Sequence, residues 1–489
     1  MIDHHTEILV RGMLLSCLLL LPACGDSTVG SQTNNSNPEA APPRYGVLSF
    51  RVSHNLEDAS CLSSGTCFVE TNEDTGVRPW LSDVRQDSDL AVLHWNRPIP
   101  YPAFAADPPD GTPRPAFYDD RLSPALLDWI NAFADHFDQM PRGYLAVSGL
   151  NSRRNRPAPS YTGEQEGAPL TSTRCPVLSP GSTFPAEGLD GATQTIDYEQ
   201  AYTNFLLYLH AKLKPEKIAL FVEANLFKKH CPTRWDGFVD LYHSIYDTVR
   251  AEVGEGPRLF TSFTYLDLLN YDFERCTGGP QVESCDGPVG DPSYGDLDSQ
   301  QCYQPDLSPV KALGQGGRMD LLALSAYPDG LLMSVPDGPA AVEIHPSTSS
   351  GRSDCEHRWV MPPVVDPWAP LDRLDWDKPL AISETSARSC PVWNWAENPD
   401  GAKLLRIPAS PTTQQYWLDR ALEVTRNQPM DFMVQSLYQD YPPVGRSFLQ
   451  NVDNPTAFNA INLWPCSGLY TRDGAPKSAL LSRWRDAVQ

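Results

Sequence analysis

Residues 378–386 read KPLAISETS, in which a short apolar run follows Pro379 and ends on the carboxylate of Glu384. Residues 217–225 read KIALFVEAN, and a similar run ends there at Glu223. Short apolar runs are typical of strands that are buried on both faces of a parallel sheet. In a (β/α)8 barrel the working residues lie at the carboxyl ends of the strands. The two runs therefore predict two barrel strands, each presenting a glutamate at the same end of the sheet.

Further runs of this kind recur along the chain, and amphipathic stretches separate them. The expected strands are residues 46–52, 90–95, 144–149, 218–223, 258–264, 321–327, 380–384 and 432–437. The expected helices are residues 123–139, 198–213, 237–253, 413–426 and 477–488. Such alternation indicates an α/β fold, either a barrel or a doubly wound sheet. The chain has 489 residues, and a barrel with long insertions fits that length, so we predict one (β/α)8 TIM barrel over residues 45–489.

Three long loops follow predicted strands, at residues 151–197, 270–305 and 328–377. Loops of this length are commonly functional or disordered. Here they follow the carboxyl ends of the strands, and we expect them to surround the mouth of the barrel and shape a groove. The acidic stretch at 286–298 has oxygen ligands suited to calcium, but it lacks a recognisable calcium-loop pattern and is read as a solvated loop.

Acidic residues outnumber basic ones, 61 to 38, for a formal charge of −23. Nucleic-acid partners are therefore not expected, because phosphate binding relies on Lys and Arg. Apolar residues make up 41% of the chain, enough for a large core. We expect a monomer.

The amino terminus has the features of an export signal. Arg11 precedes an apolar stretch at residues 13–21 that is too short to span a bilayer. It continues into Leu-Pro-Ala-Cys at residues 21–24, which resembles a bacterial lipobox. That resemblance implies a lipoprotein signal peptide at residues 1–24 and a lipid anchor on Cys24. The alternative is an ordinary secretory signal cleaved at Ala23.

Residues 25–44 are rich in Ser, Asn, Gly and Pro and have little to bury. They predict a disordered tether that holds the domain away from a membrane. In lipoproteins, Asp after the lipid-bearing Cys favours retention in the inner membrane. Gly25 stands at that place, so we expect an outer-membrane location in the cell envelope.

Twelve cysteines, less Cys17 and Cys24 of the signal region, leave ten. An even number in an exported chain predicts disulfides. Spacing does not fix their connectivity, but Cys61 with Cys67, Cys175 with Cys231 and Cys355 with Cys390 are the expected pairs. Cys276, Cys285 and Cys302 share one loop. Zinc-ligand spacing with matching histidines is absent from the sequence, so no metal is expected.

The paired glutamates suit one chemistry in particular. A retaining glycosidase uses two carboxyl groups about 5 Å apart, one as the acid/base and the other as the nucleophile. We assign Glu223 as the acid/base, because the apolar run before it favours the protonated carboxyl. Glu384 is the candidate nucleophile and must be ionised.

Several motifs resemble the clan of retaining barrel glycoside hydrolases whose acid/base follows strand 4 and whose nucleophile follows strand 7. They are residues 196–225, 320–328 (with LSAYP at 324–328), 378–384 and 468–484 (with GLYTRDG at 468–474). Within the clan, the closest likeness is to the arabinogalactan endo-β-1,4-galactanase (glycosyl hydrolase family 53) proteins. The resemblance implies the same assignment of Glu223 and Glu384, and a hydrogen bond from Tyr327 to Glu384.

One residue departs from the clan pattern. The clan has Asn just before the acid/base, where this chain has Val222. Asn225, two residues after Glu223, is a candidate to replace it. Two alternatives remain for Glu223: it matches an earlier glutamate of the clan motif, so that the acid is missing, or it is a buried structural carboxylate paired with an arginine.

Other residues are candidates to line the groove. Tryptophans supply flat faces that stack on sugar rings, although tryptophans are also common in cores. The predicted substrate-binding residues are Tyr327, Asn225, His94, Trp95, Trp235, Trp393, Trp395, Trp464 and Gln435. His94 is alternatively a structural histidine, Tyr327 a packed rim aromatic, and Arg153 and Arg154 either orient Glu384 or cap a loop.

Other chemistries lack their motifs. The sequence has no Gly-X-Ser-X-Gly elbow and no phosphate-binding loop, and no cofactor is implied. The leading hypothesis is a retaining glycoside hydrolase acting on a carbohydrate outside the cytoplasm. The alternatives are a non-catalytic, glycan-binding surface lipoprotein with an eroded site, which Val222 favours, and a structural barrel without a sugar site.

Overall fold

The structure is a computed structural model of the chain. It describes residues 42–48, 56, 59–64, 73–140, 142–163, 167–271, 281–286, 302–327, 341–347, 355–360, 368, 370–371, 376–398, 401–453, 455 and 461–489. The predicted signal peptide, Cys24 and most of the tether lie outside these residues, as do Cys67 and Cys276. Among the described residues, no helix is both long and apolar enough to cross a bilayer.

Two sheets of parallel strands form the centre of the molecule. One has the order β1 (Arg44–Val47), β16 (Met430–Gln435), β13 (Leu380–Thr385), β10 (Leu322–Ala326) and β8 (Ser262–Thr264). The other has the order β2 (Ala91–Trp95), β3 (Gly143–Val147), β6 (Lys217–Ala219) and β7 (Arg258–Phe260). A strand is present at all eight predicted positions. The predicted α/β class with parallel strands is confirmed.

The two sheets approach each other at both sides. Only Thr261 separates β7 from β8 along the chain. On the other side a parallel bridge joins Gly46 of β1 to Leu90, next to β2. Gly46 permits this close approach, since a Cβ there would lie 2.5 Å from Cγ2 of Val92.

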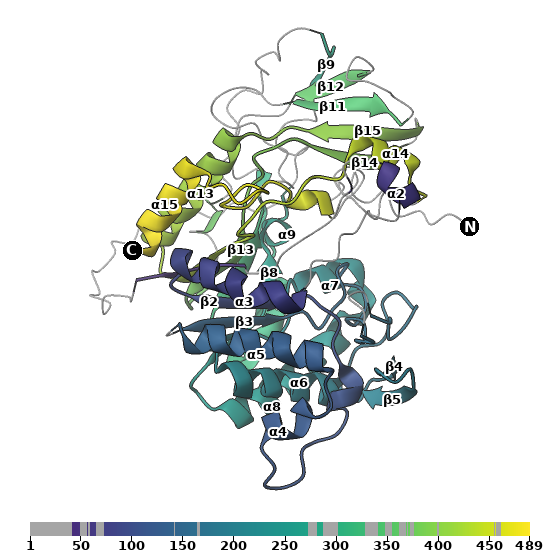
Figure 1. Cartoon of the computed structure of the whole chain (residues 1–489), viewed down its shortest axis with the longest axis vertical. Coiled ribbons are helices and arrows are strands. Elements are labelled where there is room, and N and C mark those ends of the chain that lie inside the picture. The colour runs from purple at the N-terminus through teal and green to yellow at the C-terminus, as the bar shows by residue number, and fades with distance from the viewer. Residues whose placement is uncertain are drawn as a thin grey trace, which may run out of the picture.

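Helices connect most of the successive parallel strands (Figure 1). The longer ones are α3 (Glu73–Val84), α5 (Pro124–Asp138), α6 (Tyr198–Leu213), α8 (Trp235–Val253), α13 (Pro411–Asn427) and α15 (Ser478–Val488). The short ones are α2 (Ser60–Ser64), α4 (Arg114–Asp119), α7 (Asn225–His230), α9 (Tyr265–Leu269), α12 (Ser308–Leu313) and α14 (Arg446–Asn451). Side chains of Ser123, Asp197 and Ser410 accept hydrogen bonds from the first turns of α5, α6 and α13. Such caps satisfy amide groups that the helix leaves unpaired.

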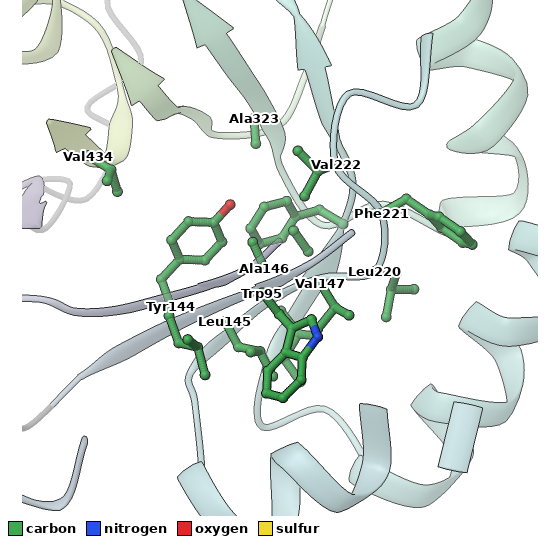
Figure 2. Packing of buried hydrophobic residues seen from close by; sticks show 14 of the residues in the cluster. Trp95, Tyr144, Leu145, Ala146, Val147, Leu220, Phe221, Val222, Ala323 and Val434 are labelled. Atoms are coloured by element: carbon green, nitrogen blue, oxygen red, sulfur yellow. The ribbon is translucent and has the colours of Figure 1, made fainter. Parts of the chain in front are cut away.

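Buried side chains alternate between the two faces of a strand, as Figure 2 shows for β3. Tyr144 lies on one side of the strand, where its ring centroid is 4.8 Å from that of Phe432 of β16. Leu145 and Val147 lie on the other side, towards the helices. Successive side chains in a strand point to opposite faces. One face of β3 therefore packs on side chains of other strands, and the opposite face packs on the helices.

A further, antiparallel sheet arises from the long loops. Its order is β14 (Val392–Asn398), β15 (Gly401–Ile407), β11 (Ala341–Pro346), β12 (His357–Val360) and β9 (Gln281–Glu283). The sheet lies at one end of the molecule (Figure 1). A two-stranded hairpin, β4 (Thr183–Glu187) and β5 (Thr193–Asp197), forms in the loop after β3. The sequence analysis predicted none of these strands.

The disulfides confirm one predicted pair and correct another. Cys175 is bonded to Cys231, as predicted. Cys355 is bonded to Cys285 and Cys390 to Cys466, so the predicted Cys355–Cys390 bond is wrong. The reason is the antiparallel sheet, which places β12 beside β9 and so brings Cys355 to Cys285.

Candidate active site

Glu384 lies near the end of β13, in a strand that is locally irregular. The pairing of β13 shifts register between Ile382 and Glu384 relative to β10, and between Ile382 and Thr385 relative to β16. Such bulges re-aim side chains and are common beside active sites. The residue is only 7% exposed, and burial raises the pKa of the Glu384 carboxyl to about 7.

Tyr327 holds one oxygen of this carboxylate. Its hydroxyl donates to Glu384 Oε2 at 2.6 Å and lies 2.7 Å from Ser436 Oγ. Because the single phenolic proton is given to Glu384, the Ser436 hydroxyl is the donor to Tyr327. The hydrogen bond from Tyr327 and the charge of Arg154 both lower the pKa of Glu384, and so partly offset burial.

His94 of β2 faces the other oxygen. Its Nδ1 lies 3.1 Å from Glu384 Oε1, although neither atom makes a hydrogen bond of good geometry among the described residues. Burial, followed by the charge of Arg154, lowers the pKa of His94 to about 3. The imidazole is therefore neutral at physiological pH and adds no positive charge to the site.

Glu223 lies beyond the end of β6 in a strained turn. Its φ is +53°, in the left-handed region, which costs a residue other than glycine roughly 1–3 kcal/mol. Its N–H donates to Ser262 Oγ at 3.0 Å, so the turn is fixed against β8. The side chain is 17% exposed. Strain of this kind persists where the surrounding structure fixes it, and it is common at functional sites.

Arg154, from the loop after β3, contacts Glu223 directly. Its Nη2 donates to Glu223 Oε2 at 3.1 Å, and its Nη1 donates to Ser148 Oγ and to the carbonyl of Asn151 at 3.1 and 3.0 Å. Arg154 also has a left-handed φ of +52°. The sequence analysis expected Arg154 either to orient Glu384 or to cap a loop. The structure shows that its carboxylate partner is Glu223, and that it also binds the loop at Asn151.

The two glutamates influence each other. Burial is the largest cause that raises the pKa of Glu223, Arg154 opposes it, and the charge of Glu384 raises it further. An ionised Glu384 thus favours the protonated form of Glu223. The arrangement places two carboxyl groups with raised pKa values in a shielded site, and a shared cation, Arg154, lowers the pKa of both.

Among the predicted sugar contacts, the structure brings Tyr327, His94 and Trp464 to this site. The ring of Trp464 meets that of Tyr327 edge to face, with 5.8 Å between centroids. Trp464 is half-buried, so part of its surface is open to solvent.

Trp95 and Trp235 occupy packing positions instead. Trp95 is fully buried, with its ring against Trp129 and Phe205 in the helical layer. Trp235, at the start of α8, is also buried and packs on Phe238. The expectation that these two rings contact substrate is corrected, since His94 points to the glutamates and its strand neighbour Trp95 must point away.

Trp393 and Trp395 lie in β14 of the antiparallel sheet. They pack against a cluster that includes Leu404 and Phe448. The ring of Trp393 lies 5.0 Å from that of His345 and under the guanidinium of Arg446. The sequence analysis expected both tryptophans in the groove, on a loop after Glu384. In the structure they belong to a strand, and their rings pack against other residues of that region.

The side chains of Asn225 and Gln435 form hydrogen bonds with backbone groups. Asn225 is buried; its Nδ2 donates to the carbonyl of Thr264 at 3.1 Å, and its Oδ1 accepts from the Thr264 N–H at 2.9 Å. Gln435 Nε2 donates to the carbonyls of Ser436 and Ser467. Asn225 therefore fastens α7 to β8 and does not replace the asparagine that Val222 displaces.

Sequence reasoning missed Ser436 and Ser262. Ser436 follows the predicted Gln435 by one position, at the carboxyl end of β16, so strand alternation was the signal for it. Ser262 contacts Glu223 through a turn that the sequence does not reveal. Among the described residues, no group of three or more His, Cys, Asp and Glu side chains could hold a metal ion.

Comparison with known proteins leaves the family open. No protein-family model matches the chain, and no curated protein matches it. Solved structures that are similar include a Bacteroides uniformis β-glucuronidase (9% identity, TM-score 0.41, 91% of this chain and 35% of that one). Another is an uncultured Clostridium sp. β-glucuronidase (8% identity, TM-score 0.39, 91% of this chain and 50% of that one). The chain thus spans between about a third and a half of the length of these proteins.

Proposed function

We propose that the protein is a retaining glycoside hydrolase that acts on a polysaccharide or oligosaccharide outside the cytoplasm. The observation that carries the proposal is the shielded pair Glu223 and Glu384, in which the charge of Glu384 favours a proton on Glu223. Retaining hydrolysis needs an ionised nucleophile and a protonated acid. Glu384 is ionised above pH about 7, and its charge then raises the pKa of Glu223.

In the first step, a carboxylate oxygen of Glu384 forms a bond to the anomeric carbon. The glycosidic C–O bond breaks, and the proton of Glu223 passes to the leaving oxygen. In the second step, Glu223 takes a proton from water, the water oxygen bonds to the same carbon, and Glu384 leaves as a carboxylate. The hydrogen bond from Tyr327 stabilises this carboxylate before attack and after release.

Arg154 supports the second half of the cycle. Once Glu223 has given up its proton, its carboxylate lies 3.1 Å from a guanidinium nitrogen that compensates the charge. The same contact opposes protonation before the first step. We therefore expect Glu223 to work best with leaving groups that need little protonation.

We also infer that the two parallel sheets are arcs of one closed (β/α)8 barrel. In support, neighbouring strands within each sheet follow one another in the order that a barrel needs. The Gly46 bridge and the continuous passage from β7 to β8 join the two ends. A barrel would bring Glu223 and Glu384 to one mouth, since both lie at carboxyl ends of strands.

The proposal includes the cellular location of the protein. The lipobox-like residues 21–24 and the polar stretch after them support an anchored lipoprotein, and the three disulfides described above suit an oxidising compartment. We propose an outer-membrane location. Labelling with radioactive palmitate, in native protein and in Cys24→Ser, tests the anchor; label in both or in neither would contradict it.

The activity is tested with a panel of nitrophenyl glycosides and polysaccharides that includes β-1,4-galactan. Glu384→Gln is expected to lose turnover on every substrate. Glu223→Gln is expected to keep a first-turnover burst of dinitrophenolate on dinitrophenyl glycosides, whose leaving groups need no proton, with a slow steady rate because the base for the second step is lost, and to lose activity on polysaccharides. Glu255→Gln, at an exposed carboxylate, is the matched control. Full activity of Glu384→Gln on a substrate that the native protein cleaves would refute the assignment.

The stereochemistry is a separate test. Proton NMR of the first product is expected to show the anomer of the substrate, and a 2-deoxy-2-fluoro glycoside is expected to add one sugar to Glu384 in a mass spectrum. An inverted first anomer would contradict the double displacement.

A second function is favoured by two observations. Val222 stands where the clan has asparagine, and Glu223 is paired with Arg154 as a structural carboxylate would be. Both fit a non-catalytic protein that binds glycans at an eroded site. Isothermal titration with a polysaccharide that gives no product would support this function over hydrolysis.

A further inference from the structure

The segment that carries Trp464 is fastened on both sides of the tryptophan. Before it, the carbonyl of Asn462 accepts from Arg388, which lies four residues after Glu384. Trp464 itself is bound through its carbonyl, which accepts from Ser467 Oγ at 2.6 Å. The tryptophan is therefore presented to Tyr327 by a backbone that is fixed locally.

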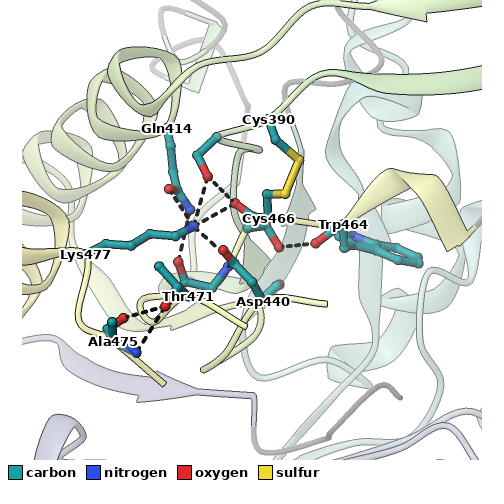
Figure 3. Close-up of polar contacts among 12 residues, drawn as sticks. Cys390, Gln414, Asp440, Trp464, Cys466, Thr471, Ala475 and Lys477 are labelled. Carbon is teal, nitrogen blue, oxygen red and sulfur yellow. Dashed lines mark hydrogen bonds and ion pairs between the residues drawn. A yellow bond between two sulfur atoms is a disulfide. The ribbon is translucent and has the colours of Figure 1, made fainter. Parts of the chain in front are cut away.

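Lys477, which directly precedes α15, is the centre of a second set of contacts (Figure 3). Its Nζ donates to Ser389 Oγ at 2.9 Å, Asp440 Oδ1 at 2.9 Å, the Cys466 carbonyl at 2.8 Å and Gln414 Oε1 at 3.2 Å. The side chain is largely buried. Since an ammonium has three protons, these four acceptors occupy all of its donor capacity.

The acceptors of Lys477 come from three separate parts of the chain. Ser389 belongs to the segment after β13, and Gln414 to α13. Asp440 and Cys466 belong to the segment after β16. One buried ammonium thus holds the segment that follows the proposed nucleophile against the segment that holds Trp464.

A disulfide joins the same two segments. Cys390 is bonded to Cys466, two residues after Trp464 (Figure 3). Beside it, the N–H and the hydroxyl of Ser389 both donate to the carbonyl of Cys466, at 3.1 and 2.8 Å. The covalent bond and the Lys477 contacts meet at one residue, Cys466.

We propose that Lys477 and the Cys390–Cys466 disulfide form one clamp that positions Trp464 against Tyr327, and through Tyr327 sets the orientation of Glu384. The contacts run in series: the clamp fixes Cys466, Trp464 meets Tyr327 at 5.8 Å, and Tyr327 donates to Glu384 at 2.6 Å. Lys477 is on this account a positioning residue, because it touches none of the reacting atoms. The effect on catalysis rests on the proposed glycosidase function, whereas the positioning of Trp464 does not.

The structural part is tested by fluorine NMR of full-length protein labelled with 5-fluorotryptophan. Trp464→Phe identifies the resonance of Trp464 by its loss. In Lys477→Met and in the double variant Cys390→Ser/Cys466→Ser, that resonance is expected to shift or broaden. Lys477→Arg keeps the charge and the donors, and is expected to restore most of the native line. An unchanged Trp464 resonance in Lys477→Met would overturn the proposal.

The double variant Cys285→Ser/Cys355→Ser is the matched control. It removes a disulfide of the antiparallel sheet and is expected to leave the Trp464 resonance in place. If it moves that resonance as far as the clamp variants do, the effect is general loosening and the proposal is wrong. Lys477→Gln, a smaller change, replaces the cysteine variant if that variant does not fold.

The kinetic part uses the nitrophenyl glycoside that the native protein cleaves fastest. Lys477→Met is expected to lower kcat by about tenfold and to move the acid limb of the pH profile upwards, because a displaced Tyr327 stabilises the Glu384 carboxylate less well. An unchanged pH profile would refute the link to Glu384. If native protein cleaves no glycoside while the Trp464 resonance responds as expected, the proposed function fails and the clamp stands.

Discussion

Replacing Glu384 by Gln should remove a specific pH dependence from the stability of the protein. In the folded state the pKa of Glu384 is about 7, against an ordinary value of 4.5, because the carboxyl is buried. Between these two values the folded protein holds a proton that the unfolded chain has released. Each pH unit therefore lowers the free energy of unfolding by about 1.4 kcal/mol, or roughly 3 kcal/mol over the whole interval. Glutamine does not titrate and avoids this loss.

The sign follows from the raised pKa. The contribution of Glu384 is fully present below pH 4.5 and is lost as the pH rises through 7. Relative to native protein, Glu384→Gln should gain roughly 3 kcal/mol from pH 4.5 to pH 7.5, and it should be the more stable form at the higher pH.

Urea denaturation of both proteins at half-unit pH steps measures this difference directly. The variant Glu255→Gln controls for a carboxylate lost from an exposed position, and its difference from native protein should be flat. A difference between native protein and Glu384→Gln that stays within about 1 kcal/mol over the interval, less than the unit shift that sets the scale, would refute the burial argument.

Three other variants test further contacts. Tyr327→Phe removes a charge-assisted hydrogen bond of about 1.5–3 kcal/mol, so the pKa of Glu384 and the acid limb of activity should rise by about one unit or more; an unmoved limb in a pH–rate profile would count against the contact. Asn225→Ala should lower the unfolding free energy by about 2 kcal/mol, measured in urea, because two buried backbone groups lose their partner, while catalysis at saturating substrate should change little. Asp87→Asn should lower the unfolding free energy by about 2 kcal/mol in the same assay, since it weakens the ion pair that joins Asp87 to α15. The expected loss is small because the Arg485 side chain is 44% exposed. An unchanged unfolding free energy would show that the pair does not stabilise the protein.

The positions of the parallel strands could be predicted, with β7 and β8 as one run, because their signal is local. Each is a short apolar run, and several, among them those that lead to Glu223 and Glu384, are followed by a polar side chain that the sheet presents at one edge. Glu223, Glu384 and the hydrogen bond from Tyr327 followed from this regularity together with the family resemblance. The strand boundaries shifted by a few residues, as at β6, where the strand ends at Ala219 and a turn delivers Glu223.

The errors concern contacts between segments that lie far apart in the sequence. Trp95 and Trp235 were assigned to the groove by residue type, although alternation with His94 already indicated the opposite face for Trp95. Asn225 binds the backbone of Thr264, and nothing near Asn225 in the sequence indicates that partner. The pairing of Cys355 with Cys285 depends on the antiparallel sheet, whose strands pair across separate loops.

That sheet has a consequence for how these loops can vary. β9 comes from the loop after the fifth parallel strand, β11 and β12 from the loop after the sixth, and β14 and β15 from the loop after the seventh. Deleting or transplanting one of these three insertions would expose an unpaired strand edge on its neighbours, which invites aggregation. They can therefore be exchanged between proteins only as a set, and during synthesis the assembly must wait until residue 407 has left the ribosome.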